Sequence, residues 1–431
     1  MDDNNYTMSR VPLSARVDLL TATLVRTGMT TALAQFMLGA TLGHSMTFSQ
    51  AMLATLLGSL ILQIVSMGVG FAGAKEGLST SLLARWCGFG RYGSSLIGAA
   101  IVISCLGWFG VQNSILAEGV VFSSKGKISF ELAAALSGGT LTLLVVLGFM
   151  GLSWTAKLAL PVFAIVVGWI FWDLLTGSRL LDLFVSVPSG PAMTLGAGAT
   201  MVAGGAIVGA LITPDITRFC KNGRHVFWMI TFSYIVGEFL VNGVAILVAH
   251  ALNTSDVVLI MTQSAGWLGL ISVILSAIKV NDTALYSSAL AVASGVEALS
   301  KRKFSYKMIT LALGAAGTAL SVLGIMTKFV GFLMLLGVLF PPIAGVMMID
   351  YYLLRTHRDL LHFTRVHGVL PDVATTPKIG WPAISSWIIG SAIGFVVDWG
   401  IPSLNSFVTA SALYWLLCTS LKKSAQRQPS C

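Results

Sequence analysis

Residues 20–43 read LTATLVRTGMTTALAQFMLGATLG, and this stretch decides the fold class. It is slightly longer than the helix of roughly 20 apolar residues that crosses a hydrocarbon core of about 30 Å. Its middle nevertheless carries Gly28, Thr31 and Gln35, and Arg26 precedes them. Polar side chains are costly at that depth, and interrupted backbone must find partners in protein or in a water-filled cavity. We therefore expect a membrane-spanning helix that is interrupted beside an internal site.

Similar apolar segments recur along the whole chain. Of its 431 residues, 55% are hydrophobic and only 10% are charged, whereas a soluble domain carries about 25% charged residues. The segments are too long and too rich in glycine for the strands of a membrane barrel. The sequence therefore predicts an all-α membrane protein with twelve transmembrane helices. These are expected at residues 20–43, 48–73, 93–119, 131–150, 157–176, 195–214, 226–251, 266–298, 306–326, 329–354, 383–400 and 404–421.

The distribution of positive charge predicts the orientation of these spans. With a cytoplasmic N-terminus, twenty of the 26 Lys and Arg residues lie inside, four lie outside and two lie within spans. Because positively charged loops stay in the cytoplasm, we expect a multi-pass protein of a bacterial inner membrane with cytoplasmic tails at residues 1–19 and 422–431. The first tail lacks the basic start and cleavage site of a signal peptide, so the first span is expected to be retained. The four outer residues are Lys125, Lys127, Arg179 and Lys328, and the two within spans are Arg26 and Lys279.

The sixth span is as unusual as the first. Residues 195–214 contain five glycines, namely Gly196, Gly198, Gly204, Gly205 and Gly209. Two interrupted spans at matching places in consecutive five-span halves are typical of inverted repeats around a midplane site. We expect a ten-helix core at residues 20–354, with repeats at 20–176 and 195–354, followed by two additional helices at 383–421. The alternative is that the glycines only permit close helix packing.

The sequence contains no motif that indicates an enzyme, a metal site or a cofactor site. Residues 88–93, GFGRYG, match a dinucleotide-binding glycine pattern, but they fall in a predicted loop between spans rather than after a strand. The five cysteines have no metal-binding spacing and imply no disulfide framework. The basic residues form no stripe with interleaved aromatics, which argues against nucleic acid. The lipid bilayer is the partner that composition requires, and no obligatory protein partner is evident.

The third span carries a face with recognisable chemistry. Cys105, Trp108 and Gln112 are spaced three and four residues apart, so they share one side of a helix. An indole offers a flat surface for stacking on a planar ring, and an amide supplies one acceptor and two donors for that ring's edge. The alternative is a tryptophan packed in the core, with Gln112 bonded to a neighbouring helix.

Several motifs along the chain resemble the cytosine permease branch of the nucleobase/cation symporter family. They are AKEGLSTSLLAR (74–85), GWFGVQ (107–112), TPDITRF (213–219), VNDTALYSS (280–288) and MIDYYLLR (348–355). The resemblance covers essentially the whole chain. It implies the five-plus-five inverted-repeat fold, alternating access, and a substrate held between spans one, three, six and eight.

The resemblance also assigns roles to residues of the site. It implies that Trp108 stacks on the base and that Gln112 bonds its edge; we assign Gln35 and Asn281 to the same site. Three positions depart from cytosine permeases. Cys105 replaces a glutamine, Gly205 a serine, and Ala206 the aromatic residue that would complete the sandwich. These changes predict a pocket that is wider and less polar on that wall and therefore fits cytosine itself less well than the pockets of cytosine permeases do. The expected substrate is a nucleobase such as cytosine or a related small heterocycle.

A second departure concerns the coupling ion. In relatives that use sodium, two hydroxyl residues of span eight bind the ion, and these align with Lys279 and Val280. We expect the Lys279 ammonium to replace sodium and to donate to carbonyls near Gly28 and Thr31, with Ser276 close by. The alternative is a structural pair between Lys279 and Asp282 on the same helix.

The intramembrane carboxylates are candidates either for a proton relay or for structural pairing. They are Glu118, Glu238 and Asp282. Arg26, near the cytoplasmic start of its span, is expected to extend its head group to the membrane interface.

The sequence therefore predicts a sodium-independent permease that imports a nucleobase-like heterocycle. Protons are the candidate coupling ion, and facilitated diffusion without a coupling ion is the alternative. A transporter of the same fold for an amine or amino-acid-like solute is one alternative. A membrane sensor or channel without coupled transport is the other.

Overall fold

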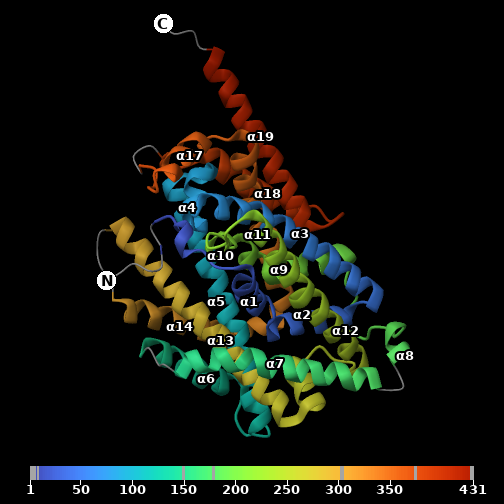
Figure 1. Ribbon diagram of the computed structural model, residues 1–431. Coiled ribbons are helices and arrows are strands. Elements are labelled where there is room, and N and C mark those ends of the chain that lie inside the picture. Colours follow the sequence, from blue (N-terminus) through green and yellow to red (C-terminus); the bar gives the residue numbers. More distant parts are fainter. Residues whose placement is uncertain are drawn as a thin grey trace.

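The computed structural model describes residue 6 and residues 9–147, 151–176, 180–300, 305–372 and 376–427. Figure 1 shows an elongated bundle in which α5 runs along the long axis. The helices are α1 (Leu19–Thr30), α2 (Leu33–Ser45), α3 (Phe48–Glu76), α4 (Thr80–Ala84), α5 (Gly90–Ser123), α6 (Phe130–Val146), α7 (Gly151–Thr176), α8 (Leu180–Phe184), α9 (Leu195–Leu211), α10 (Pro214–Thr217), α11 (Gly223–Tyr234), α12 (Val241–Leu252), α13 (Val257–Ser300), α14 (Tyr306–Val322), α15 (Phe329–Leu339), α16 (Pro341–Met348), α17 (Arg358–Val366), α18 (Trp381–Val396) and α19 (Pro402–Arg427). Short 3-10 or π-helical turns are η1 (Leu13–Ala15), η2 (Arg85–Phe89), η3 (Ile235–Leu240), η4 (Ile325–Lys328) and η5 (Ile349–Leu354).

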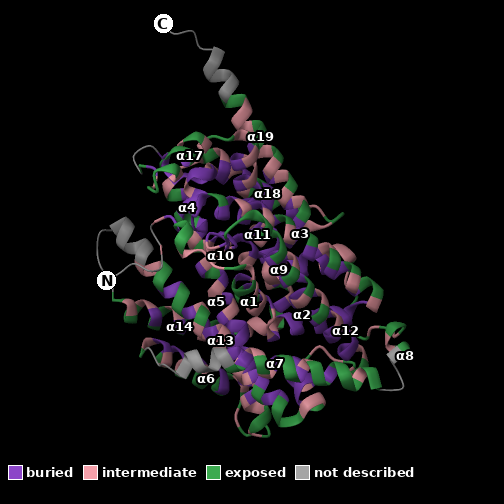
Figure 2. Cartoon of the chain, viewed as in Figure 1, coloured by how far each residue is buried: buried purple, intermediate pink, exposed green. Residues whose placement is uncertain are grey.

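The helices have the length and surface expected in a membrane. Among the described residues, eight helical stretches are long and apolar enough to cross a bilayer, and three shorter apolar helices are α6, α14 and α18. Figure 2 shows buried residues gathered in the centre of the bundle, whereas α7 and α19 are mainly half-buried or exposed. On α7, Trp169 is 58% and Trp172 62% exposed. Large apolar residues exposed in this number fit contact with lipid rather than with water.

The first span is interrupted at its centre, as the sequence predicted. Helix α1 ends at Thr30, Thr31 and Ala32 adopt extended backbone, and α2 then begins at Leu33. The start of α1 is capped by the Asp18 carboxylate, which accepts from the backbone N–H groups of Leu20 and Thr21. The interruption leaves backbone carbonyls of α1 available to partners on other helices.

The sixth span departs from the prediction. Helix α9 runs unbroken through all five glycines, and the interruption falls later, at Ile212 and Thr213 before α10. The glycines serve close packing instead: a Cβ on Gly204 would lie 1.8 Å from the carbonyl oxygen of Leu333 in α15. The opposite side of α9 approaches α3, where a Cβ on Gly58 would lie 2.5 Å from Val202. The expectation that the glycines break the helix is wrong, and the packing alternative holds at these positions.

The glycine motif at residues 88–93 is also placed differently from the predicted loop. The chain from Thr80 to Ser123 is continuously helical, with a kink where η2 meets α5. Gly88 and Gly90 make this kink with φ of 91° and 75°, values that favour glycine. The motif therefore redirects a long helix.

Two large apolar clusters fill the bundle, one toward each end. One includes residues of α3, α4, α16 and α18, and the other includes residues of α2, α7, α12 and α15. Trp108 and Phe332 pack against both clusters. The region around Trp108 therefore lies between the two ends, where a substrate site reached from either side would be expected.

Candidate functional site

Helices α5 and α13 pack against each other and set the frame of the site. Cys105 of α5 faces Ser288 of α13. The two helices are antiparallel there, so seven residues along α5 and seven back along α13 lead to Gln112 and Asn281. Continuing for four residues in the same register leads to a small buried cluster that includes Leu116, Leu141 and Ala277. Because each residue adds about 1.5 Å along either helix, the register places Gln112 and Asn281 at the same level.

These two amides have no bonding partner in the described part of the chain. Gln112 and Asn281 are both 0% exposed, and neither the oxygen nor the nitrogen of either amide is hydrogen-bonded. A buried polar group left unpaired costs about 1–3 kcal/mol. Two such amides at one level are therefore suited to a ligand that offers both donors and acceptors.

Trp108 lies one turn before Gln112 and is held by two phenyl rings. Its indole meets Phe332 edge-to-face at 5.6 Å between centroids and Phe329 at 6.4 Å. Both phenylalanines belong to α15, which packs closely against α9. The indole is half-buried, so its orientation is fixed while part of its surface stays accessible.

The wall formed by α9 is built from small residues. A Cβ on Gly205 would lie 2.5 Å from Leu38 and 4.0 Å from Oε1 of Gln35. Ala206 packs at the edge of one apolar cluster, as Trp108 does. Gly205 of α9 thus lies against the first half of α2, beside the predicted site residue Gln35.

Gln35 is tied to a buried carboxylate that sequence reasoning did not connect with it. Its Nε2 donates to Oε2 of Glu238 at 2.8 Å and to Oδ1 of Asn242 at 3.0 Å. Glu238 and Asn242 are four residues apart, so they share a helix face, which is the signal that could have identified Asn242. The predicted proton-relay candidate Glu238 thus contacts a predicted substrate residue.

Lys279 reaches from α13 to the end of α1. Its Nζ donates to the carbonyl oxygen of Gly28 at 3.1 Å. Among the described residues Lys279 and Asp282 form no ion pair. The structure therefore does not contain the pair between these two side chains that was the alternative. The hydroxyl of Thr31 is buried and has no partner among the residues that the structure describes. Ser276 is buried on α13, three residues before Lys279.

The other two carboxylates lie apart from Glu238. Glu118 follows Gln112 by six residues on α5. It lines a cavity of about 450 Å³ together with His44 and Asp256. Asp282 is half-buried on α13. The three acidic residues therefore do not form one cluster, and a single relay through all of them has no continuous path in the described structure.

Arg26 does not extend to the membrane interface as predicted. It is 1% exposed, and its guanidinium donates to the carbonyl oxygen of Gly209 at 2.8 Å, to Tyr234 at 3.1 Å and to Ser66 at 3.3 Å. These partners come from α9, α11 and α3. An arginine predicted inside a span was the signal for such a role, because a charge there requires buried partners.

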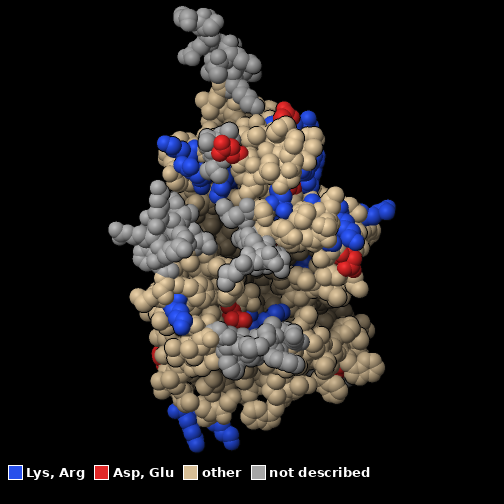
Figure 3. All heavy atoms as spheres, turned by 60° about the vertical axis from the view of Figure 1, so that its left-hand side comes forward, with Lys and Arg blue, Asp and Glu red and all other residues tan. Residues whose placement is uncertain are grey.

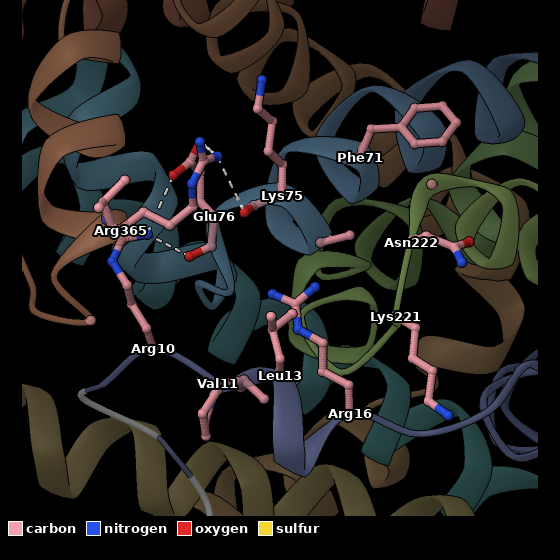
Figure 4. Close-up of a pocket in the computed structure, with 15 residues that line it drawn as sticks. Arg10, Val11, Leu13, Arg16, Phe71, Lys75, Glu76, Lys221, Asn222 and Arg365 are labelled. Atoms are coloured by element: carbon pink, nitrogen blue, oxygen red, sulfur yellow. Dashed lines mark hydrogen bonds and ion pairs between the residues drawn. The ribbon is translucent and has the colours of Figure 1, made fainter.

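A large cavity of about 690 Å³ lies elsewhere, at the end of the bundle where α3 stops (Figure 4). Arg10 and Arg365 converge there on Glu76, each 3.2–3.3 Å from one of its carboxylate oxygens. Backbone bonds fasten the N-terminal segment beside it, from Val11 to Gly77 and from Val17 to Phe219. No predicted site residue lines this cavity, so we do not assign it to the substrate.

The surface also shows a recess at mid-height. In Figure 3 the face is hollowed between an upper and a lower part, and both acidic and basic atoms are visible near it.

The chain is similar to one known protein family and to curated proteins of known name. The family described as "Permease for cytosine/purines, uracil, thiamine, allantoin" matches residues 11–417. The cytosine permease of Escherichia coli strain K12 is 30% identical over 416 residues, covering 96% of this chain and 94% of that protein. The cytosine permease of Escherichia coli O157:H7 gives the same values.

Solved structures show the same fold. The inward-facing conformation of Mhp1 matches with a TM-score of 0.79 at 19% identity, covering 96% of this chain and 93% of that one. Mhp1 in a closed conformation with bromovinylhydantoin bound, described as a nucleobase-cation-symport-1 family transporter, matches with 0.70 at 19% identity, covering 100% and 97%. A sodium-coupled sialic acid symporter matches with 0.60 at 13% identity, covering 97% and 92%.

Proposed function

Because this chain belongs to the nucleobase/cation symporter family of permeases for cytosine, purines and related compounds, we propose that it imports a nucleobase or a similar small planar heterocycle by alternating access. Membership makes it a secondary transporter and not an enzyme. Family membership alone does not identify the substrate. The proposal about the substrate rests on the amides of Gln112 and Asn281, which lie at the same level beside Trp108 and have no hydrogen-bond partner among the described residues.

The chemistry of these groups suits a flat, polar-edged ring. An aromatic heterocycle can stack on the accessible surface of the indole. Its edge can then offer donors and acceptors to both amides, each of which supplies one oxygen and two N–H groups. A purely apolar solute would leave the amides unpaired, and a large solute would meet the phenyl rings that hold Trp108.

A panel of bases tests the substrate class. We expect nucleobases or related heterocycles to raise the unfolding temperature of the purified protein, whereas amines and amino acids do not. The Cys105→Gln/Ala206→Phe variant restores two groups that the resemblance places in cytosine permeases, so it is expected to gain cytosine affinity by about tenfold, the value of one stacking or bidentate contact. Labelled uptake into proteoliposomes is the companion measurement. If no heterocycle binds and an amine does, the proposal is wrong.

One observation favours a different solute. Glu118, Asp256 and His44 gather around the 450 Å³ cavity, and two carboxylates suit a cationic solute better than a neutral base. An amine transporter of the same fold is therefore the second candidate. Ligand binding without any uptake would instead indicate a sensor or channel.

For the architecture we propose twelve spans with both termini in the cytoplasm of an inner membrane. The proposed core at residues 20–354 comprises inverted repeats at 20–176 and 195–354, with two additional spans at 383–421. The charge asymmetry supports this orientation. Alkaline phosphatase fused after Lys221, in the basic turn that follows α10, is expected to be inactive, and a fusion after Lys125 active. Activity in the first fusion and none in the second would reverse the topology.

For coupling, we propose that transport is independent of sodium and that Lys279 occupies the place of the ion. The bond from its ammonium to the Gly28 carbonyl supports the proposal, since a carbonyl of the interrupted first span is the kind of ligand that sodium would use. Protons are the proposed coupling ion.

A further inference from the structure

Glu238, Gln35 and Asn242 form a buried polar cluster next to the interrupted first span. Glu238 and Asn242 are both 0% exposed. Among the described residues, Oε1 of Glu238 and Nδ2 of Asn242 have no hydrogen-bond partner. The only bonds within the cluster run from the two N–H groups of Gln35 to Glu238 Oε2 and Asn242 Oδ1. The cluster is therefore incompletely bonded in this arrangement.

The backbone holds this cluster tightly. Glu238 lies in the π-helical turn η3, a distortion that is frequent at functional sites. A Cβ on Gly237 would lie 2.5 Å from the Thr30 hydroxyl, so η3 is pressed against the last turn of α1. A Cβ on Gly39 would lie 2.8 Å from the Cα of Asn242, so α2 and α12 are equally close. Movement of the carboxylate away from Gln35 is consequently restricted.

The free end of the Gln35 amide faces the candidate substrate site. Because both of its N–H groups are occupied by Glu238 and Asn242, its oxygen points the other way, to within 4.0 Å of where a Cβ on Gly205 would be. In this arrangement Gln35 therefore presents an acceptor to the wall formed by α9.

Protonation of Glu238 would favour the opposite orientation. A protonated carboxyl has an O–H to donate, and an amide oxygen can accept two hydrogen bonds. If the amides of Gln35 and Asn242 both turn over, the Gln35 oxygen accepts from Glu238 and from Asn242 Nδ2, which otherwise lacks a partner. The Gln35 nitrogen then faces the pocket as a donor. The ionised and protonated states thus differ in the group that the pocket offers.

We propose that Glu238 binds the coupling proton and that Gln35 reports its protonation to the substrate, presenting a donor only when Glu238 is protonated. This inference rests on the proposed function and deepens it. The ligand that fits has a carbonyl oxygen or an unprotonated ring nitrogen facing Gln35. The proton moves from solution to a Glu238 carboxylate oxygen, with no other bond made or broken.

Substrate and proton then assist each other's binding. A ligand that accepts a hydrogen bond from Gln35 binds better to the protonated state, and by reciprocity it strengthens proton binding. The direction of the pH dependence follows. The protein has its full affinity for the ligand while Glu238 is protonated, and it loses that affinity as the pH rises and Glu238 ionises. One linked proton gives a loss of about tenfold per pH unit in that range.

Two other titratable or charged groups face Glu238 from the described elements packed against η3. Arg26 of α1 and Tyr234 of α11 interact with it electrostatically and are hydrogen-bonded to each other at 3.1 Å. Guanidinium groups are not deprotonated in proteins. The described titratable side chains of α2, α3 and α12, such as His44, Lys75 and His250, lie toward the ends of those helices. The pH dependence is therefore assigned to Glu238.

The test uses purified full-length protein and the base that binds best in the panel. Wild type is expected to take up about one proton per ligand from a weakly buffered solution, and its affinity should fall with rising pH. Gln at position 238 resembles the protonated carboxyl because it can donate to Gln35. Glu238→Gln should therefore bind at high pH with the affinity that wild type has at low pH, take up no proton, and exchange substrate without accumulating it under a pH gradient. Glu131→Gln, which changes an exposed carboxylate at the start of α6, is the control and should keep the wild-type pH dependence.

The outcomes separate this inference from the proposed function. Ligand binding by wild type without proton uptake overturns the inference alone. A Glu238→Gln protein with weaker binding at every pH and an unchanged pH dependence would show that Glu238 is structural. Failure of every heterocycle to bind would overturn both proposals.

Discussion

Trp108→Ala is expected to lower substrate affinity by at least tenfold and to abolish measurable uptake. Stacking on an aromatic side chain contributes about 1–3 kcal/mol per base in nucleic-acid-binding proteins, and 1.4 kcal/mol is a factor of about ten in affinity. The indole lies between the two apolar clusters and is oriented by Phe329 and Phe332, so alanine also removes the surface that aligns a ring with Gln112. Radiolabelled uptake and equilibrium binding measure the effect.

The control for this prediction is a tryptophan outside the site. Trp172 of α7 is 62% exposed, so Trp172→Ala should bind and transport as wild type does. Gln112→Ala should weaken binding strongly but leave the unfolding temperature unchanged or higher, because the buried amide that it removes has no partner in the described part of the chain. Wild-type affinity in folded Trp108→Ala protein would mean that the indole belongs only to the core.

Features that depend on neighbouring residues could be predicted from the sequence. The shared face of Trp108 and Gln112 follows from helical spacing alone. The interruption at Thr31 and Ala32 was indicated by polar residues within one apolar segment, and the structure has it there. Both inferences need only the chain within a few turns.

Features that depend on distant partners could not be predicted in the same way. Glycine both weakens a helix and permits close packing. Which of the two roles applies to Gly204 depends on the carbonyl group of Leu333, more than a hundred residues away in the sequence. The bonds from Arg26 to Gly209 and from Gln35 to Glu238 likewise join segments about two hundred residues apart. Local periodicity contains no information about such pairs, although a polar residue within a span shows that a partner is required.

Lys279→Ala is expected to abolish transport whether or not sodium is present, and wild-type uptake should not change when choline replaces sodium. Helix α1 packs mainly against α11, so the bond from Lys279 to the Gly28 carbonyl is a specific link between α13 and the interrupted span. A compact ammonium with three donors can stand where a monovalent cation would sit. Alanine removes the positive charge and the link together, and it supplies no oxygen with which sodium could restore them.

Two further variants decide between this role and the alternatives. Asp282→Asn should retain transport, because Asp282 is not paired with Lys279; its loss would reinstate a functional pair on α13. Lys279→Ser with Val280→Thr returns the two adjacent hydroxyls that the resemblance places in sodium-using relatives, and oxygen ligands are what a hard cation prefers. That double variant should recover uptake only when sodium is added. A steep rise of wild-type uptake with sodium would refute the replacement, since the ammonium and the ion cannot occupy the same place against Gly28.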